Sequence, residues 1–386
     1  MAWRITKRAG GLVLAIALAS AQPSVLGRVA QASAAEVGPH EGLFDVVARR
    51  QMLSQPGSAA LRRSCLAIKA DKDWANLEVV EGFSPTAGYG TDRAGSRFAW
   101  AVMVLSGRSL AGDMTSTRML RDILNKWAAK GAFSKTEVTH DAYYALKRVL
   151  LPTIVAFSVL RPELSEAEEA RLRDWIDPLV RRVDQTFNGD VDINNHRYLA
   201  DSVLMLWGGV VNDTALYEKG RTRFASIIDE ARPDGSLPLE TRRGARALWY
   251  MRQSLTSMLI MAEVARGRGE DLYHQADVDS QNGRRSLWTI FSYWLNGIHN
   301  PILTNSYAAE NYIPGPERDY FMQDLGFLDS RGNGRHYLAF LEILGARPQQ
   351  SLTTARALQF LNQDAGNERP LIDEFVGGNA TCFWGT

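Results

Sequence analysis

The chain has 386 residues, which is long enough for a large buried core and for one to three domains. Its 44 Lys and Arg residues nearly balance its 43 Asp and Glu residues, so the net charge is +1. This balance excludes a large net positive charge that would attract nucleic acid or an anionic membrane. Any polyanionic ligand must therefore be held by cations that the fold brings together.

The first 34 residues have the pattern of an export signal. Arg4 and Lys7 precede the apolar run 11–21, and Ala32-Ser33-Ala34 forms a small-residue cleavage site. We predict a signal peptide over 1–34, a single mature domain over 35–386, and a location in the periplasm or outside the cell. An uncleaved anchor is the alternative, although the apolar run is short for a membrane span. No later segment predicts a span, so no membrane partner is expected after cleavage.

Apolar residues recur at three- and four-residue spacings along most of the chain, which predicts α-helices. Helices are expected over 43–68 with a break at Pro56-Gly57, and over 93–105, 114–129, 140–160, 199–211, 215–231, 242–266, 287–298, 337–344 and 353–361. A capping box at Ser165 and Glu168 starts one more helix, which Pro178 should kink or split. Strand-type alternation is expected only around Phe375 and over 381–384.

These elements predict an all-α fold, either a helical solenoid or a toroid of helical hairpins. Because no fixed-period repeat is present, the closed toroid is favoured. Residues 70–92 carry aromatic residues and glycines typical of a loop that covers a cleft, although an ordinary packed connection would have the same composition.

Cys65 and Cys382 stand near opposite ends of the predicted mature chain. In an oxidising compartment they could form a disulfide that closes a long loop, and two buried free thiols are the alternative. The histidines are scattered and show no metal-ligand spacing, so no metal is expected.

The segment 194–198, Asn-Asn-His-Arg-Tyr, stands directly before the apolar run 199–211. Its two amides and imidazole lie where a polar ligand could meet the edge of the core. An isolated histidine such as His196 is more often structural, but the neighbouring Asn194 and Asn195 favour a site. Asp201 is the acid within the apolar run, so it must be paired, capping or functional.

A second polar group lies in the segment 246–253. Arg246, Tyr250 and Gln253 have the i, i+4 and i+7 spacing of residues on one helix face. The turn-rich residues 233–240 before them would bring the helix start to the rim of a cleft. A solvated arginine and a half-buried tyrosine would give the same pattern.

Three motifs together resemble the alginate lyases of polysaccharide lyase family 5 and their wider superfamily. They are residues 194–198, the Asp-Gly-Ser-Leu-Pro-Leu-Glu stretch over 234–240, and Arg246-Ala247-Leu248 with Tyr250. The resemblance extends from about Cys65 to a closing segment over 377–381. It implies an incomplete α/α toroid, a periplasmic location, and cofactor-free, metal-independent β-elimination on an anionic uronic-acid polysaccharide.

The resemblance also implies catalytic roles. Asn195 and Arg246 would neutralise the substrate carboxylate beside the C5 proton, because negative charge develops there as the proton leaves. His196 would remove that proton as a neutral imidazole. A tyrosine would then protonate the leaving O4 oxygen.

The tyrosine position is where this chain departs from the family pattern. We place the family's tyrosine one turn beyond Tyr250, where the chain has Gln253, and an amide cannot act as a general acid at neutral pH. Three explanations stay open. Tyr250 takes over the proton, a loop tyrosine such as Tyr89, Tyr307 or Tyr312 does so, or the protein binds polymer without cleaving it.

Other side chains could hold the remaining carboxylates of the polymer, although a solvated surface charge explains each cation equally well. The candidate substrate-binding residues are Asn194, Lys147, Arg148, Arg252, Gln253 and Tyr89.

The function expected from these observations is a secreted lyase that cleaves an alginate-like, mannuronate or glucuronate polymer and leaves a 4,5-unsaturated uronate end. The alternative is a non-catalytic polysaccharide-binding protein, partnered with an exopolysaccharide export complex. A glycoside hydrolase on the same fold would need two facing carboxylates, for which the candidates are Asp192, Asp201, Asp234 and Glu240.

Overall fold

The computed structural model describes residues 40–85, 93–186, 194–279, 283–307, 323–347, 356 and 369–386. Several predictions from the sequence lie outside these residues. They are the signal peptide over 1–34, the candidates Tyr89, Asp192 and Tyr312, and, apart from Arg356, the helix over 353–361.

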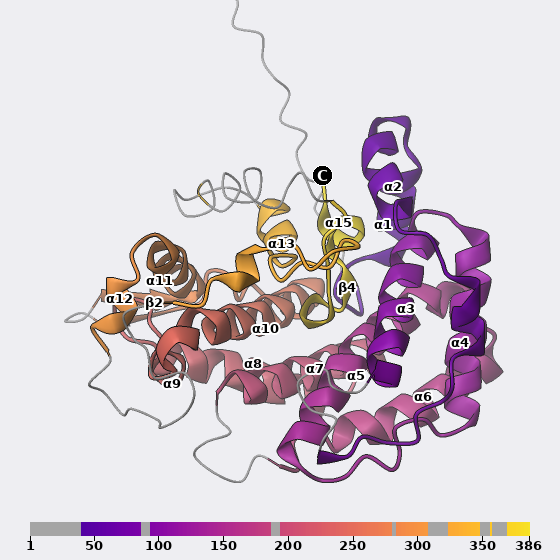
Figure 1. Cartoon of the computed structure of the whole chain (residues 1–386), viewed down its shortest axis with the longest axis horizontal. Coiled ribbons are helices and arrows are strands. Elements are labelled where there is room, and N and C mark those ends of the chain that lie inside the picture. Colours follow the sequence, from indigo (N-terminus) through magenta and orange to yellow (C-terminus); the bar gives the residue numbers. More distant parts are fainter. Residues whose placement is uncertain are drawn as a thin grey trace, which may run out of the picture. The chain divides into compact units, whose positions relative to one another are not determined.

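Helices form most of the described chain (Figure 1). The α-helices are α1 Val46–Ser54, α2 Ala59–Leu66, α3 Arg93–Leu110, α4 Met114–Ala129, α5 His140–Leu160, α6 Glu166–Arg181, α7 Asn195–Val211, α8 Thr214–Glu230, α9 Pro238–Thr241, α10 Ala247–Gly267, α11 Leu287–His299, α12 Ile302–Asn305, α13 Leu341–Gly345 and α15 Ala380–Trp384. The short 3-10 turns are η1 Pro56–Ser58, η2 Lys72–Asn76, η4 Arg161–Glu163, η6 Gly244–Arg246, η7 Gly326–Leu328 and η10 Glu374–Val376. Two small antiparallel pairs are formed by β1 Ala276–Asp279 with β2 Gly283–Ser286, and by β3 Ile372–Asp373 with β4 Gly378–Asn379.

Successive helices pack as hairpins. Helix α3 packs against α4 and α5, α7 against α8, and α10 against α7 and α11. Their facing sides form one continuous apolar core, which includes the fully buried Trp127, Trp207 and Trp294. The predicted all-α fold of helical hairpins is confirmed.

The α7–α8 hairpin illustrates how the sequence makes these turns. Asn212 ends α7 in the left-handed conformation with φ 59°, and the Asp213 carboxylate caps α8 by accepting from the amide nitrogens of Ala215 and Leu216 at 3.0 and 3.2 Å. Gly208 lets the two helices touch, since a Cβ there would stand 2.5 Å from the Tyr217 nitrogen. The two-residue connection therefore places α8 directly against α7.

Helix α5 is long, apolar and almost entirely buried. The stretch 140–163 is long and apolar enough to cross a membrane by length and composition, but 89% of its most apolar window is buried inside the fold. It packs against α3, α6 and α7. We therefore assign it to the protein core.

Four details differ from the sequence predictions. Helix α6 runs unbroken through Pro178, so the predicted split is wrong, whereas its capping box at Ser165 is present. Helix α10 begins at Ala247, so Arg246 is its N-cap rather than an interior residue. The expected strand over 381–384 is the helix α15, and the β1–β2 hairpin was not predicted.

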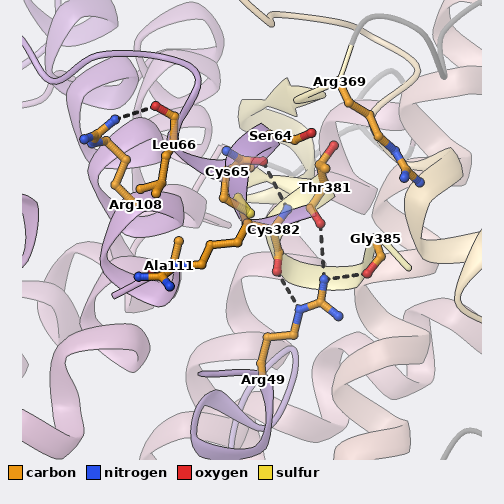
Figure 2. Close-up of a disulfide and its surroundings, with 12 residues drawn as sticks. Arg49, Ser64, Cys65, Leu66, Arg108, Ala111, Arg369, Thr381, Cys382 and Gly385 are labelled. Atoms are coloured by element: carbon orange, nitrogen blue, oxygen red, sulfur yellow. Dashed lines mark hydrogen bonds between the residues drawn. A yellow bond between two sulfur atoms is a disulfide. The ribbon is translucent and has the colours of Figure 1, made fainter. Parts of the chain in front are cut away.

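The C-terminal segment 369–386 is tied to the N-terminal helices (Figure 2). Cys65 in α2 and Cys382 in α15 form a disulfide, with their Cα atoms 5.4 Å apart. The Arg49 guanidinium of α1 donates to the carbonyl oxygens of Thr381, Cys382 and Gly385 at 3.2, 2.6 and 2.7 Å. These carbonyls lie at the end of α15, so the arginine joins α1 to the C-terminal segment and fixes it.

Candidate functional site

A cavity of about 370 Å³ opens between α3, α5, α10 and the C-terminal segment. It is lined by aromatic rings and guanidinium groups, a combination suited to an anionic sugar chain. The lining residues are Phe83, Gly95, Ser96, Ala99, Met103, Tyr144, Ala145, Arg148, Val149, Arg246, Trp249, Tyr250, Gln253, Arg331, Arg335, Tyr337, Glu374 and Phe375.

His196 lies in the first turn of α7, behind one wall of this cavity. The Asn194 side chain caps the helix by accepting from the His196 amide nitrogen at 3.1 Å. The imidazole stacks on the cavity-lining ring of Tyr144, with ring centroids 4.4 Å apart. Burial and the positive charges of Lys147, Arg243 and His140 lower the pKa of His196 well below 6.5. The imidazole is therefore neutral at neutral pH and can accept a proton.

Lys147 supports the backbone of this turn rather than lining the cavity. Its ammonium group is buried and donates to the carbonyl oxygen of His196 at 3.2 Å. One of the candidate substrate-binding residues therefore holds the candidate base in place.

Asn195 connects α7 to α10. Its amide nitrogen Nδ2 donates to Oε1 of Gln253, which lines the cavity. Its backbone N–H donates at 2.8 Å to Glu240, whose carboxylate also accepts from the Ser254 hydroxyl at 3.0 Å. Glu240 is fully buried, and burial raises its pKa. The carboxyl group thus anchors Asn195 from the side away from the cavity.

Arg243 lies over the ring of the candidate tyrosine, and it was not predicted from the sequence. Its guanidinium carbon lies 4.0 Å from the ring centroid of Tyr250, and its charge lowers the pKa of His196. Arg246 lines the cavity, whereas Arg243 does not, but the Arg246 side chain is 44% exposed and lies 3.4 Å from the Asp324 carboxylate. Arg243 is therefore a further candidate for binding the substrate carboxylate, the role that we predicted for Arg246.

Two further candidate cations pair with the acids of the C-terminal segment. Arg148 lines the cavity and forms an ion pair with Glu374. Arg252 is fully buried, 3.4 Å from Asp373, and is absent from the cavity lining. Burial and the Glu374 charge raise the pKa of Asp373, whereas the charges of Arg148 and Arg331 lower the pKa of Glu374. The carboxylate of Glu374 consequently stays ionised beside the cavity.

The acids proposed for a hydrolase do not face each other across the cavity. Asp201 is buried and lies 3.0 and 2.9 Å from the guanidinium groups of Arg197 and Arg223. Asp234 accepts from the Tyr307 hydroxyl, and Glu240 anchors Asn195. None of these three acids lines the cavity, so the geometry gives no support to the hydrolase alternative.

The chain belongs to the alginate lyase family, because the model of that family matches residues 94–302, just over half of the chain. It is 31% identical over 209 residues to a polysaccharide lyase of Stenotrophomonas maltophilia, covering 48% of this chain and 63% of that protein. It is 29% identical over 201 residues to an alginate lyase of Azotobacter vinelandii, covering 47% of this chain and 50% of that protein. The match therefore spans less than two thirds of either relative.

Solved structures show the same fold. Alginate lyase A1-III from Sphingomonas species A1 superposes with a TM-score of 0.70 at 21% identity, covering 90% of this chain and 96% of that one. A Tyr-to-Phe variant of A1-III in complex with a tetrasaccharide superposes with a TM-score of 0.71, covering 91% and 97% of the two chains. The incomplete α/α toroid predicted from the sequence is confirmed.

Proposed function

We propose that the chain is a polysaccharide lyase that cleaves a uronic-acid polymer by β-elimination. One observation carries the proposal: Arg243 lies over the ring of Tyr250, a hydroxyl donor, and its charge helps to keep the His196 imidazole neutral. Elimination needs such a pair, one group to take a proton and one to give it. A uronate polymer also needs cations nearby to bind its negatively charged carboxylates.

In the proposed reaction, the neutral His196 imidazole takes the C5 proton of the uronate. The electron pair of the C5–H bond forms the C4–C5 double bond, and the C4–O4 bond breaks with its pair going to oxygen. The Tyr250 hydroxyl supplies the proton that O4 requires. Asn195 and Arg243 bind the carboxylate beside C5, whose negative charge grows as the proton leaves.

The choice of Tyr250 over position 253 is supported by the A1-III variants. That enzyme was solved as a His-to-Ala and as a Tyr-to-Phe variant, at positions 54 residues apart. His196 and Tyr250 are also 54 residues apart in this chain. The equal spacing favours Tyr250 as the counterpart of that tyrosine, rather than Gln253 as the sequence pattern suggested. Tyr250 is almost fully buried and lines the cavity, and Gln253 positions Asn195.

We also propose that the protein works outside the cytoplasm, as the basic start and apolar run of residues 1–34 predict. The disulfide between Cys65 and Cys382 supports this location, because such bonds persist in oxidising compartments. Cell fractionation with thiol labelling tests it. A protein found in the cytoplasm with two free thiols would contradict the proposal.

The experiment for the activity follows the absorbance of the unsaturated uronate on mannuronate, guluronate, glucuronate and galacturonate polymers. We expect absorbance to grow on at least one polymer with the wild type and to vanish with His196→Ala. The exposed Lys130→Gln variant is the control and should match the wild type. Polymer binding by the wild type without any absorbance would instead support the non-catalytic polysaccharide-binding alternative.

A further inference from the structure

The cavity contains more cationic side chains than the proposed elimination uses. The described residues that line it include four arginines, Arg148, Arg246, Arg331 and Arg335, and one carboxylate, Glu374, while Arg246 pairs with Asp324 outside the lining. Since one substrate carboxylate is assigned to Asn195 and Arg243, the other guanidinium groups are left without a role in the reaction. Arg331 and Arg335 also lie outside residues 94–302, which the family model matches.

Glu374 orders two of these arginines. Its Oε1 accepts from Arg148, and its Oε2 lies 3.5 Å from Nη1 of Arg331. Both guanidinium groups also lie over aromatic rings, with Arg148 5.4 Å from the Tyr144 centroid and Arg331 4.2 Å from the Tyr337 centroid. A planar guanidinium has donors on more than one edge, so each can bind Glu374 and still donate to another anion. The buried Nε of Arg148 has no hydrogen-bond partner among the residues that the structure describes.

The third arginine is placed by the same C-terminal segment. Residues 334–336 pair with Ile372, whose nitrogen donates to the Gly334 carbonyl at 2.8 Å and whose oxygen accepts from the His336 nitrogen at 3.0 Å. The tight turn before them requires left-handed conformations, with φ of 77°, 54° and 81° at Gly332, Asn333 and Gly334. Arg335 then lies with its guanidinium 4.3 Å from the centroid of the Trp100 ring. The turn and its pairing with Ile372 therefore place Arg335 in the cavity lining.

We propose that Arg148, Arg331 and Arg335, the first two ordered by Glu374, form a second carboxylate-binding subsite in the cavity that holds a uronate next to the one being cleaved. This inference rests on the proposed function, because it takes the ligand to be a uronic-acid chain. Two carboxylates on neighbouring sugars would then be bound by different groups, one by Asn195 and Arg243 and one by this cluster. Charge-assisted bonds from ordered arginines favour an anionic sugar over a neutral one.

The test measures binding of uronate oligomers, from the monomer to the pentamer, by calorimetry in the His196→Ala background, which we expect not to cleave them. The affinity should rise sharply at the length that first reaches the second subsite. Arg331→Gln and Arg335→Gln should each lower the affinity for longer oligomers by about tenfold or more and leave that of shorter ones nearly unchanged. Arg118→Gln, which removes an equal charge from the exposed face of α4, should change nothing.

Glu374→Gln tests whether the carboxylate orders the cluster. It should remove the same length-dependent gain, although it makes the cavity more positive. Tighter binding by this variant would overturn the ordering role, and equal losses at every length would overturn the second subsite. The test is separate from that of the proposed function. If the wild type forms no unsaturated product, the proposed function fails, whereas an active wild type with unaltered arginine variants refutes only the subsite.

Discussion

The ring of Tyr144 stacks on the imidazole of His196, with centroids 4.4 Å apart and planes inclined by 16°. The ring shields one face of the imidazole from water, while Lys147, Arg243 and His140 surround it with positive charge. Both effects disfavour the protonated form. The candidate base is therefore tuned by residues from α5 and from the turn before α10.

The first prediction concerns pH. Protonation of His196 removes the base, so the acid limb of kcat/KM should lie below pH 6.5, the usual pKa of histidine. Lys147→Gln removes a positive charge, which favours the imidazolium and raises its pKa. The limb should then move to higher pH, as measured by a pH profile of kcat/KM. Lys130→Gln serves as the control, and a limb that stays in place in Lys147→Gln would refute the electrostatic explanation.

The second prediction separates the candidate acids. Tyr250→Phe should lower kcat by about 100-fold to 10,000-fold, because it removes the proton for the leaving oxygen. Tyr307→Phe should have little effect, since its hydroxyl already donates to Asp234 and the residue does not line the cavity. Initial rates of absorbance growth decide between them. Full activity in Tyr250→Phe with a large loss in Tyr307→Phe would show that Tyr307, rather than Tyr250, is the general acid.

The third prediction concerns the amide pair. Gln253→Ala should lower kcat/KM by roughly tenfold, because Asn195 loses the partner that orients its amide. Gln253→Glu keeps an oxygen acceptor for the Asn195 amide and should lose less at the pH optimum. Steady-state kinetics of the two variants measure the difference. Two equal losses would show that Gln253 acts through something other than this hydrogen bond.

The fourth prediction concerns Glu240. Leucine there would leave the Asn195 N–H and the Ser254 hydroxyl without their acceptor, so unfolding free energy should fall by about 1 to 3 kcal/mol for each unpaired group. Glutamine retains an acceptor and should cost less. Since burial raises the Glu240 pKa above 4.5, the folded protein binds this proton more tightly than the unfolded chain does. Glutamine should therefore gain stability relative to wild type as pH rises above 4.5, which urea denaturation at several pH values measures.

The fifth prediction concerns the disulfide. Cys382→Ser should lower the free energy of unfolding by about 2 to 5 kcal/mol, because the bond restricts an unfolded chain over a separation of 317 residues. Cys65→Ser should cost the same, and the double variant should lose nothing more. Chemical denaturation under non-reducing conditions measures all three. A double variant much less stable than either single one would contradict the shared bond.

The helices were the most predictable part of the molecule. Helices α4 and α5 have the bounds that apolar periodicity predicted, because Asp113 and Thr139 cap their first turns and the periodicity runs to their ends. Of the two outcomes predicted for Pro178, a kink or a split, the split is wrong because α6 continues through it to Arg181. Packing of the α6 face against α4, α5 and α7 outweighs the missing hydrogen bond.

The site was predicted in part. The cavity and its surroundings bring together Asn195, His196, Tyr250 and Gln253, which came from two motifs. Arg243 was missed because Gly244, with φ 58°, interrupts the helix, so the helical spacing counted from Arg246 does not apply there. Neither Glu374 nor Arg331 could be predicted as part of the cavity, because each is placed there by contacts with residues far away in the chain.

The tethered C-terminal segment has a consequence for how the protein gains activity as it folds. Glu374 meets Arg148 across 226 residues, so the cavity wall is completed only when segment 369–386 docks. The hairpins from α3 to α11 can form helix and bring His196 near Tyr250 before that event. During refolding, the circular dichroism signal of the helices should therefore recover before catalytic activity does. The interval between the two signals should report how long segment 369–386 takes to dock.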